Sequence, residues 1–209
     1  CERISPEAPV QVVNVDREST VLGGAGNVVN NLNSLGAKVD VISVIGECKT
    51  SGELKGLLAD IKVDTQYLIT QKDRVTSKKS RIIAAHQQVV RYDRESTDEI
   101  NNNSQIAILD FFKTIVNNYD VILLSDYGKG VLTFELTQSL ITIANENEKK
   151  LLVDPKGLNY SKYNGAYLLT PNKKEASEAT NSVIKDNKSL TQAIKSLKKQ
   201  CNLEVSLIT

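Results

Sequence analysis

The sequence predicts an α/β fold: a three-layer α/β/α domain with a mostly parallel, doubly wound sheet and a small additional β-sheet. Three observations support this prediction. After about residue 100, short apolar runs alternate with segments of helical spacing, which is the pattern of right-handed βαβ units. Three successive strands in that half end in polar side chains. The first hundred residues hold more strand candidates than helices, which indicates the extra sheet.

The composition is that of a globular protein with one sizeable domain. The 209 residues carry 26 basic and 25 acidic side chains, and a net charge of +1 favours neither a nucleic-acid nor a membrane partner. Three dispersed cysteines and one histidine do not have the spacing of a zinc site, and unpaired cysteines favour the cytoplasm. No apolar run approaches the roughly 18 residues of a membrane span. The chain begins at Cys1 without a signal peptide, so we expect a fragment of a longer protein.

The first half of the chain is expected to combine short strands with two helices. Strands are expected at residues 10–15, 39–45, 67–69, 80–83 and 89–93. Apolar residues at helical spacing predict helices over residues 25–35 and 54–61. Thr50 and Glu53 have the spacing of a capping box before the second helix. His86 fits a hydrogen-bonded position at a strand end better than a metal ligand or a general base.

The second half is expected to alternate helices and strands. Helices are expected over residues 106–116, 136–144 and 190–197, and strands at 121–124, 150–153, 166–169 and 203–208. The uniformly apolar run at 121–124 is typical of a strand that is buried on both faces of a parallel sheet. Ligands of such sheets bind beyond the carboxyl ends of the strands, which makes the residues that follow each strand the candidates for function.

Polar side chains follow three of these strands. Asp126 and Lys129 come after the first, Asp154 and Lys156 after the second, and residues 172–175 after the third. A single set of this kind is often an ordinary turn. Because the carboxyl ends of parallel strands meet at one edge of a sheet, three such sets indicate a shared binding crevice.

A glycine-rich segment, residues 22–27, opens the first predicted helix. Its glycines allow a ligand to approach the backbone, and free N–H groups at a helix start attract oxyanions or hydroxyls. A dinucleotide-binding fingerprint of an NAD-dependent oxidoreductase is the alternative, with Glu47 as its acidic residue. Val29 stands where the third glycine of that fingerprint belongs, and the preceding strand candidate ends well before the turn, so this alternative is disfavoured.

Two further motifs have structural as well as functional interpretations. Asn172 and Glu175 have the spacing of a capping box, and the same geometry suits phosphates and hydrated magnesium at a helix start. Arg81, Gln87 and Arg91 lie on or beside predicted strands, where they can either bind a ligand or protect an edge strand from aggregation.

Taken together and in this order, these segments resemble the ribokinase-like (PfkB-type carbohydrate kinase) superfamily. Within it they are most similar to the kinase domains of the bacterial heptose-7-phosphate kinase and heptose-1-phosphate adenylyltransferase proteins. The matching segments are residues 3–10, 22–35, 86–93, 125–132, 154–157 and 160–175. The resemblance implies one incomplete kinase domain over residues 1–209, with lid strands drawn from about 1–20 and 37–95.

The resemblance also implies an activity. It would be the ATP-dependent phosphorylation of the anomeric C1 hydroxyl of D-glycero-D-manno-heptose 7-phosphate, in the route to ADP-heptose and the lipopolysaccharide core. The implied cofactors are ATP and Mg²⁺, and the implied location is the bacterial cytoplasm. A homodimer formed through the lid and a fused C-terminal adenylyltransferase domain are further implications.

The residues that would carry this activity follow by analogy. The implied substrate-binding residues are Arg3, Glu7, Gly23, Gly24, Asn27, Arg81, Gln87, Arg91, Asp126 and Lys129. The implied ATP-binding residues are Asp154, Lys156, Asn172, Lys173, Lys174 and Glu175, of which Asn172 and Glu175 would face Mg²⁺ through water.

The sequence departs from the superfamily in three places. The acid on the first strand and the G-A-G-D segment with the catalytic aspartate are not found, and Cys48 stands where an acid commonly follows Gly46-Glu47. We therefore expect the first strand and the catalytic base to lie outside residues 1–209 and this segment alone to be inactive. Another sugar kinase of the superfamily, and a non-catalytic module that binds sugar phosphate or nucleotide, remain as alternatives.

Overall fold

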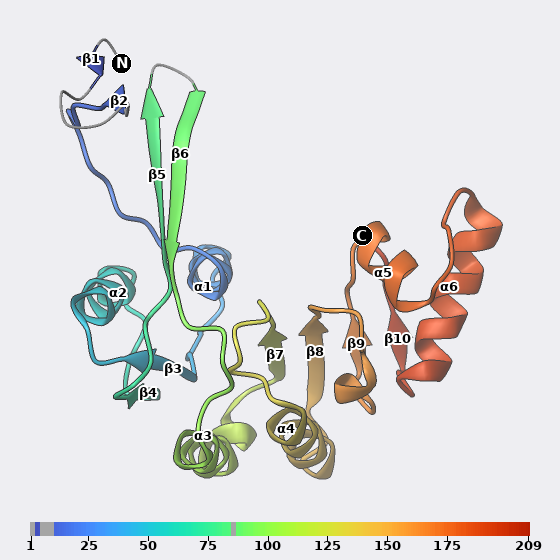
Figure 1. Cartoon of the computed structure of the whole chain (residues 1–209). Coiled ribbons are helices and arrows are strands. Elements are labelled where there is room, and N and C mark those ends of the chain that lie inside the picture. Colours follow the sequence, from blue (N-terminus) through green and yellow to red (C-terminus); the bar gives the residue numbers. More distant parts are fainter. Residues whose placement is uncertain (1–2, 5–10, 85–86) are drawn as a thin grey trace.

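The computed structural model describes residues 3–4, 11–84 and 87–209, and its centre is a parallel sheet (Figure 1). Four parallel strands lie in the order β10-β9-β8-β7. They are β7 (Val121–Ser125), β8 (Lys150–Asp154), β9 (Leu168–Leu169) and β10 (Val205–Ser206). A second parallel pair joins β3 (Ser43–Gly46) to β4 (Leu68–Gln71). The predicted parallel α/β architecture is confirmed.

The helices follow the predicted apolar spacing. They are α1 (Ala25–Ser34), α2 (Lys49–Asp60), α3 (Asn102–Ile115), α4 (Phe134–Glu146), α5 (Lys173–Ala179) and α6 (Asn187–Gln200). Short 3₁₀ turns, η1 (Val116–Asn118) and η2 (Ser161–Tyr163), follow α3 and β8. The side chains of Asn101, Thr133, Asn172 and Asp186 accept backbone N–H groups at the starts of α3 to α6, which explains where these helices begin. Among the helices of the described residues, none combines the length and apolarity that crossing a membrane requires.

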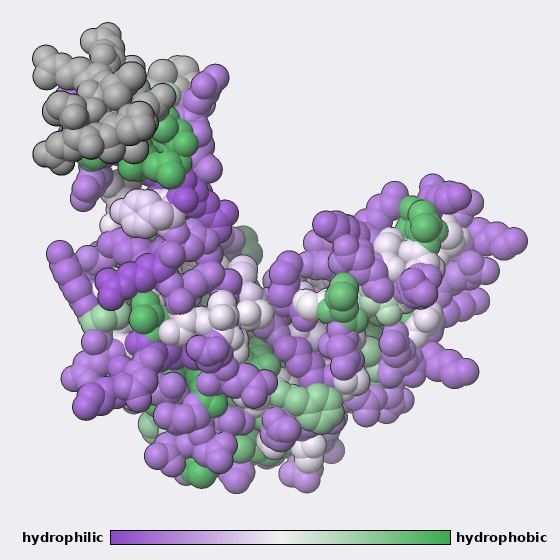
Figure 2. All heavy atoms as spheres, in the orientation of Figure 1, coloured by the Kyte–Doolittle hydropathy of each residue, from purple (hydrophilic) through white to green (hydrophobic). Residues whose placement is uncertain are grey.

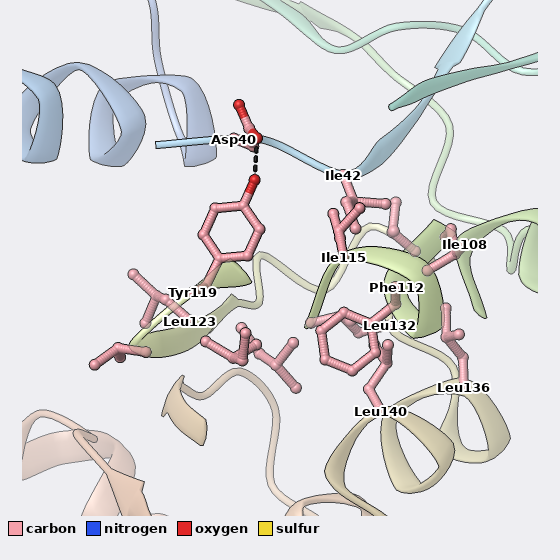
Figure 3. Close-up of a pocket in the computed structure, with 14 residues that line it drawn as sticks. Asp40, Ile42, Ile108, Phe112, Ile115, Tyr119, Leu123, Leu132, Leu136 and Leu140 are labelled. Atoms are coloured by element: carbon pink, nitrogen blue, oxygen red, sulfur yellow. Dashed lines mark hydrogen bonds between the residues drawn. The ribbon is translucent and has the colours of Figure 1, made fainter. Parts of the chain in front are cut away.

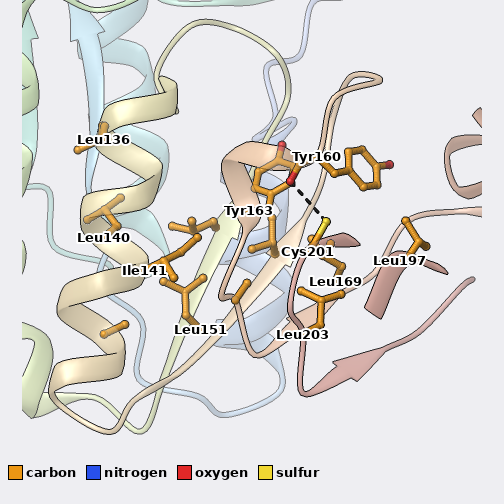
Figure 4. Packing of buried hydrophobic residues seen from close by; sticks show 14 of the residues in the cluster. Leu136, Leu140, Ile141, Leu151, Tyr160, Tyr163, Leu169, Leu197, Cys201 and Leu203 are labelled. Carbon is orange, nitrogen blue, oxygen red and sulfur yellow. Dashed lines mark hydrogen bonds between the residues drawn. The ribbon is translucent and has the colours of Figure 1, made fainter. Parts of the chain in front are cut away.

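Two apolar clusters hold the fold together. The larger one packs α3, α4 and α6 against β7 to β9 and includes the fully buried Leu151, Leu169 and Leu197 (Figure 4). The smaller one joins α1 and α2 to β3 and β4 through Ile45 and Leu58. Burying such side chains stabilises a fold by about 1.5–3 kcal/mol each, so these clusters fix the sheet whose strand ends carry the polar residues.

The small extra sheet is present as well. Strand β5 (Lys78–Ala84) pairs with β6 (Gln87–Arg94) in an antiparallel hairpin that rises away from the main sheet (Figure 1). Strands β1 (Arg3–Ile4) and β2 (Gln11–Val12) form a second antiparallel pair. Every residue of β6 is exposed, which is the arrangement of a lid rather than of a core sheet.

Several predicted elements differ from the structure in length. The strands expected at 10–15, 39–45, 166–169 and 203–208 are shorter, because strand pairing begins only where a partner strand lies alongside. The predicted capping box of α2 is wrong. The helix begins after Cys48, Thr50 lies inside it, and Glu53 instead accepts a hydrogen bond from Lys78 at 2.7 Å.

The prediction that residues 121–124 are buried on both faces is also wrong. Val121 and Leu123 are 49% and 39% exposed, because β7 borders an apolar slot (Figure 3). Helices α3 and α4 line the slot as well, together with Asp40, Ile42, Tyr119, Val131 and Leu132. The Tyr119 hydroxyl donates to the Asp40 carboxylate (Figure 3). In the described parts of the chain, β7 pairs with β8 alone and β3 with β4 alone.

Candidate active site at the carboxyl edge of the sheet

A broad hollow lies over the carboxyl ends of β7 and β8. The lid hairpin and α1 border it on one side and the α5 region on the other (Figures 1 and 2). The loops that follow β7 and β8 therefore line its floor, as the alternation of strands and helices predicted.

Asp126, at the start of the β7 loop, is buried and bonded on both carboxylate oxygens. Oδ1 accepts the Gly128 backbone N–H at 2.7 Å. Oδ2 accepts the Lys162 ammonium at 2.6 Å and the Tyr163 hydroxyl at 2.7 Å. The residue is only 6% exposed. A direct contact between Asp126 and a sugar hydroxyl stays a prediction, since protein donors already surround this carboxylate.

The end of the β7 loop is held against the base of the lid. Gly130 has φ +73°, and a Cβ there would lie 2.0 Å from the Asp98 carbonyl oxygen, so this contact requires glycine. The buried Arg74 guanidinium donates to the carbonyls of Asp98, at 3.1 Å, and of Lys129. Arg74 was not identified from the sequence, because its backbone-carbonyl partners leave no pattern in the chain.

Lys129 connects the loop to the lid through a series of ion pairs. Its ammonium lies 2.5 Å from Glu95, which also pairs with Lys79 at 2.9 Å. Lys79 contacts Asp93 at 2.9 Å, and Asp93 contacts Arg91 at 2.7 Å. Hydrogen bonds from Lys129 and then Lys79 lower the pKa of Glu95. Lys129 and Arg91, both predicted to bind substrate, are thus partly neutralised by lid carboxylates.

The glycine turn before α1 lies beside the same loop. Gly24 has φ +54°, and a Cβ at this position would lie 3.8 Å from the Tyr127 ring. The Asn27 backbone N–H donates to the Gly24 carbonyl at 3.0 Å and begins the helix. The dinucleotide alternative is wrong, because residues 13–22 form no strand that ends at this turn.

The ends of β8 and β9 supply a second polar group. Lys156 contacts Glu175 at 2.9 Å. Asn172 and Glu175 form a capping box, in which each side chain accepts the backbone N–H of the other at 3.0 and 3.1 Å. Burial, followed by the Glu175 carboxylate, raises the pKa of Asp154. The predicted capping box is present. It holds Glu175 at the edge of the sheet, which is also the position expected for a residue that faces phosphates and hydrated magnesium.

These groups bear on the magnesium prediction. Within the described residues, no three His, Cys, Asp or Glu side chains cluster closely enough to form a metal site. Both Glu175 oxygens already accept protein hydrogen bonds. A hydrated ion that is contacted through water fits this arrangement better than a directly ligated one.

The remaining predicted residues lie farther from the floor of the hollow or cannot be assigned to it. Arg81 and Gln87 are exposed on the lid hairpin, where Arg81 lies opposite Arg91 in the strand register. Lys173 and Lys174 are exposed on α5. Arg3 lies in β1, and Glu7 and His86 lie outside the described residues.

The chain is similar to known proteins over its whole length. The family described as "pfkB family carbohydrate kinase" matches residues 1–209. Curated relatives named "Bifunctional protein HldE" are 63% identical in Aliarcobacter butzleri and 56% identical in Sulfurimonas denitrificans, each across 100% of this chain. The chain spans 44% of the length of each of these relatives.

Solved structures share the fold at lower identity. Arabidopsis thaliana ribokinase, complexed with ribose and ATP, has a TM-score of 0.70 at 14% identity and covers 95% of this chain and 64% of its own. Escherichia coli phosphofructokinase-2, in complex with fructose-6-phosphate, has a TM-score of 0.68 at 21% identity. The match covers 89% of this chain and 61% of the phosphofructokinase chain. These likenesses confirm the predicted ribokinase-like three-layer α/β/α fold.

Proposed function

This chain belongs to the pfkB family of carbohydrate kinases, and we propose that its full-length protein phosphorylates D-glycero-D-manno-heptose 7-phosphate. ATP donates the phosphoryl group, and the anomeric C1 hydroxyl accepts it. The observation that carries the proposal is that the start of α1, the carboxyl ends of β7 and β8, and the α5 region border one hollow (Figures 1 and 2), and that the glycine turn, the β7 loop and the Lys156–Glu175 pair belong to these elements. The choice of sugar rests on the resemblance of residues 3–10 and 125–132 to heptose-phosphate kinases. The reaction would serve ADP-heptose and lipopolysaccharide synthesis in the bacterial cytoplasm.

The sugar phosphate is proposed to bind between the glycine turn and the lid. Gly23 has open space around it, so a sugar hydroxyl can approach the backbone at the start of α1. Lys129 and Arg91 offer cationic groups near this side, and their present carboxylate partners can be exchanged for phosphate oxygens. Arg81, Gln87, Arg3 and Glu7 are assigned to the same side by the resemblance.

ATP is proposed to bind on the α5 side of the hollow. Lys156, the start of α5 and, by the resemblance, Lys173 and Lys174 would neutralise its phosphates. The resemblance assigns Asp154 to the same site. Glu175 and Asn172 would hold Mg²⁺ through water, and the ion would supply further positive charge to the phosphates. This arrangement agrees with the hydrogen bonds that already occupy both Glu175 oxygens.

The proposed reaction moves one phosphoryl group in line between two oxygens. The bond from the γ-phosphorus to the bridging oxygen of ATP breaks, a bond to the C1 oxygen forms, and the hydroxyl proton passes to a base. We propose that this base is an aspartate of a G-A-G-D segment beyond Thr209, as the resemblance implies. Residues 1–209 alone would then bind substrates without turning them over.

The same resemblance guides the proposed assembly. The curated relatives are more than twice as long as this chain, which supports a fused adenylyltransferase domain in the full-length protein. Ile83, Val90 and Tyr92 are exposed on the lid hairpin at 64%, 44% and 59%. A two-stranded hairpin with such a surface is marginal by itself, which supports a homodimer formed through the lids.

The apolar slot beside β7 supports the proposal that a strand is supplied from outside residues 1–209. Its occupant would be the strand that precedes Cys1 in the full-length protein, running parallel between β3 and β7. Two observations favour this occupant. Both flanking pairs are parallel, and the slot is lined by β7 and by Asp40 and Ile42, which lead into β3, while β3 and β7 each have one partner strand within the described residues.

The assay uses full-length protein with heptose 7-phosphate, ATP and magnesium. We expect ADP release and a new anomeric phosphate signal in the ³¹P NMR spectrum. Fructose 6-phosphate and ribose serve as comparison substrates. ADP release with either of these, and none with the heptose, would reject the proposed substrate and leave another sugar kinase of the family.

A binding module without catalysis is tested on the same samples. Calorimetry would show binding of ATP and of heptose 7-phosphate whether the protein is a kinase or a binding module. A binding module, however, would release no ADP with any sugar. Reading the gene beyond Thr209 separates the two independently, because a downstream G-A-G-D segment supplies the base that a module does not need.

A further inference from the structure

Two residues of η2 form a buried polar contact that joins the sugar side of the hollow to the nucleotide side. Tyr163 is completely buried, and its hydroxyl donates to Asp126 Oδ2 at 2.7 Å. The same hydroxyl accepts the Lys156 backbone N–H at 3.1 Å. Burial raises the pKa of Tyr163, so the hydroxyl keeps its proton and remains a donor. One oxygen atom therefore connects the loops that follow β7 and β8.

The contacts around this hydroxyl extend to both substrate sites. Asp126 accepts the Gly128 N–H and so shapes the turn that leads to Lys129. On the other side, the Lys156 ammonium pairs with Glu175 at 2.9 Å. A shift of the hydroxyl contact would change the position of one loop relative to the other.

Lys162 completes the cluster and compensates its charge. Its ammonium lies 2.6 Å from Asp126 Oδ2 and also donates to the Leu132 carbonyl at 3.3 Å. A buried carboxylate without a partner is costly, and this ion pair places a compensating positive charge beside Asp126. The cluster is thus internally satisfied and does not need a ligand to form.

We infer that Tyr163 is a positioning residue, whose hydroxyl fixes the Lys156 loop relative to the Asp126 loop so that phosphoryl donor and acceptor align. The inference rests on the proposed function, because the two loops are assigned to ATP and to the sugar phosphate. Reacting groups that are misplaced by about 1 Å can lose about a hundredfold in rate, so a lost hydrogen bond far from the chemistry can matter.

Tyr160 provides a matched control. Its ring lies 5.7 Å from that of Tyr163, edge to face, and both rings pack in the same core (Figure 4). Tyr160 is 1% exposed, and its hydroxyl has no hydrogen-bond partner in the structure as described. Replacing either tyrosine by phenylalanine removes one buried hydroxyl and keeps the ring, but only one of the two changes breaks the contact between the loops.

The experiment compares Tyr163→Phe with Tyr160→Phe in the full-length protein. We expect Tyr163→Phe to lower kcat by about tenfold or more and to raise the KM for ATP and for the sugar. We expect Tyr160→Phe to leave all three unchanged. Melting temperatures are measured alongside. A purely structural role would lower the melting temperature of Tyr163→Phe but leave kcat unchanged at assay temperatures well below the melting temperature.

Two measurements do not depend on the identity of the sugar. Hydrogen exchange at the Lys156 amide should become faster in Tyr163→Phe and stay unchanged in Tyr160→Phe, and calorimetry should show weaker ATP binding in Tyr163→Phe alone. If wild-type protein does not turn over the heptose, the proposed substrate fails while these comparisons still decide the inference. Without turnover, equal ATP affinity in the two variants would overturn the inference, even if exchange at Lys156 changes. With turnover, equal kcat and KM in the two variants would overturn it.

Discussion

At the scale of single residues, the environment of each polar group decides what it contributes. Asp154 is the last residue of β8, at the floor of the hollow and close to the Glu175 and Asp126 carboxylates. Burial first, and then these like charges, raise its pKa, so the folded protein holds this carboxylate less favourably than water does. A group kept at such a cost suggests function rather than stability.

Asp154→Asn should therefore raise the melting temperature at neutral pH while lowering activity. Because the folded pKa lies above the unfolded one, the penalty is absent at pH values below the unfolded pKa. It develops as the pH rises toward the folded pKa and is complete above it. Melting curves of both proteins from pH 3.5 to 8 would show the gain shrinking as the pH falls. A gain that is the same at all pH values would contradict this explanation.

Other residues could be recognised from the sequence only as chemical types. Lys129 was predicted to lie at the sheet edge, but its ion pair with Glu95 comes from a segment 34 positions earlier in the chain. Arg74, Lys162 and Tyr163 were not singled out. Their partners are backbone carbonyls or side chains brought close by folding, which no local spacing indicates.

At the scale of elements, the spacing of capping residues predicted the helix start correctly where their side chains bond to the backbone of their own helix. Asn172 and Glu175 form the predicted capping box of α5. Thr50 and Glu53 do not cap α2, because Glu53 lies between Lys49 and Lys78 and pairs with them instead. A side chain that has a stronger tertiary partner does not take the cap that its spacing allows.

Glu175→Gln separates the two roles of the α5 cap. Glutamine keeps an oxygen for the Asn172 N–H but removes the charge that holds Lys156 and faces the proposed magnesium ion. We expect kcat of the full-length kinase to fall by about tenfold or more, in line with the loss of one electrostatic contact at a phosphoryl group. The free energy of unfolding should change by less than about 1 kcal/mol, because the cap remains.

The capping box of α6 provides the control for this prediction. Ser189 and Asp186 form an equivalent box at the start of a helix whose residues were not assigned to either substrate. Ser189→Ala removes the hydroxyl that accepts the Asp186 N–H, so it should cost about 1 kcal/mol of stability and leave kcat unchanged. If Glu175→Gln has an unchanged kcat at saturating magnesium, Glu175 has no role in catalysis and only caps α5.

At the scale of the whole molecule, the slot beside β7 is the largest difference from the sequence-based picture. A run of four apolar residues was expected to be covered on both faces, yet Leu123 remains 39% exposed. The expectation assumed that both faces of the strand are covered, but Val121 and Leu123, which share one face, are exposed beside a sheet edge that is unpaired within the described residues. The apolar pattern of residues 121–124 agrees with a complete sheet in the full-length protein.

Leu123→Asp should therefore destabilise the full-length protein by about 2 kcal/mol or more, since a charge would be buried beneath the proposed strand. Leu158→Asp is the control, because Leu158 is 68% exposed and does not line the slot. Urea unfolding of both variants measures the difference. The proposed strand would be rejected if the two substitutions cost the same in the full-length protein, or if Leu123→Asp cost as much in residues 1–209 alone.

The sequence by itself determined the fold class, the order of the elements and the sheet edge that carries the polar groups. These features follow from local periodicity and from helix and strand signals, which act over a few residues. Only the tertiary structure decided which polar groups meet. Tyr163 bridges Asp126 and Lys156, Glu95 pairs with Lys129, and Gly24 lies against Tyr127. Such contacts depend on how distant segments pack, so their energies are set by burial and geometry that spacing along the chain does not encode.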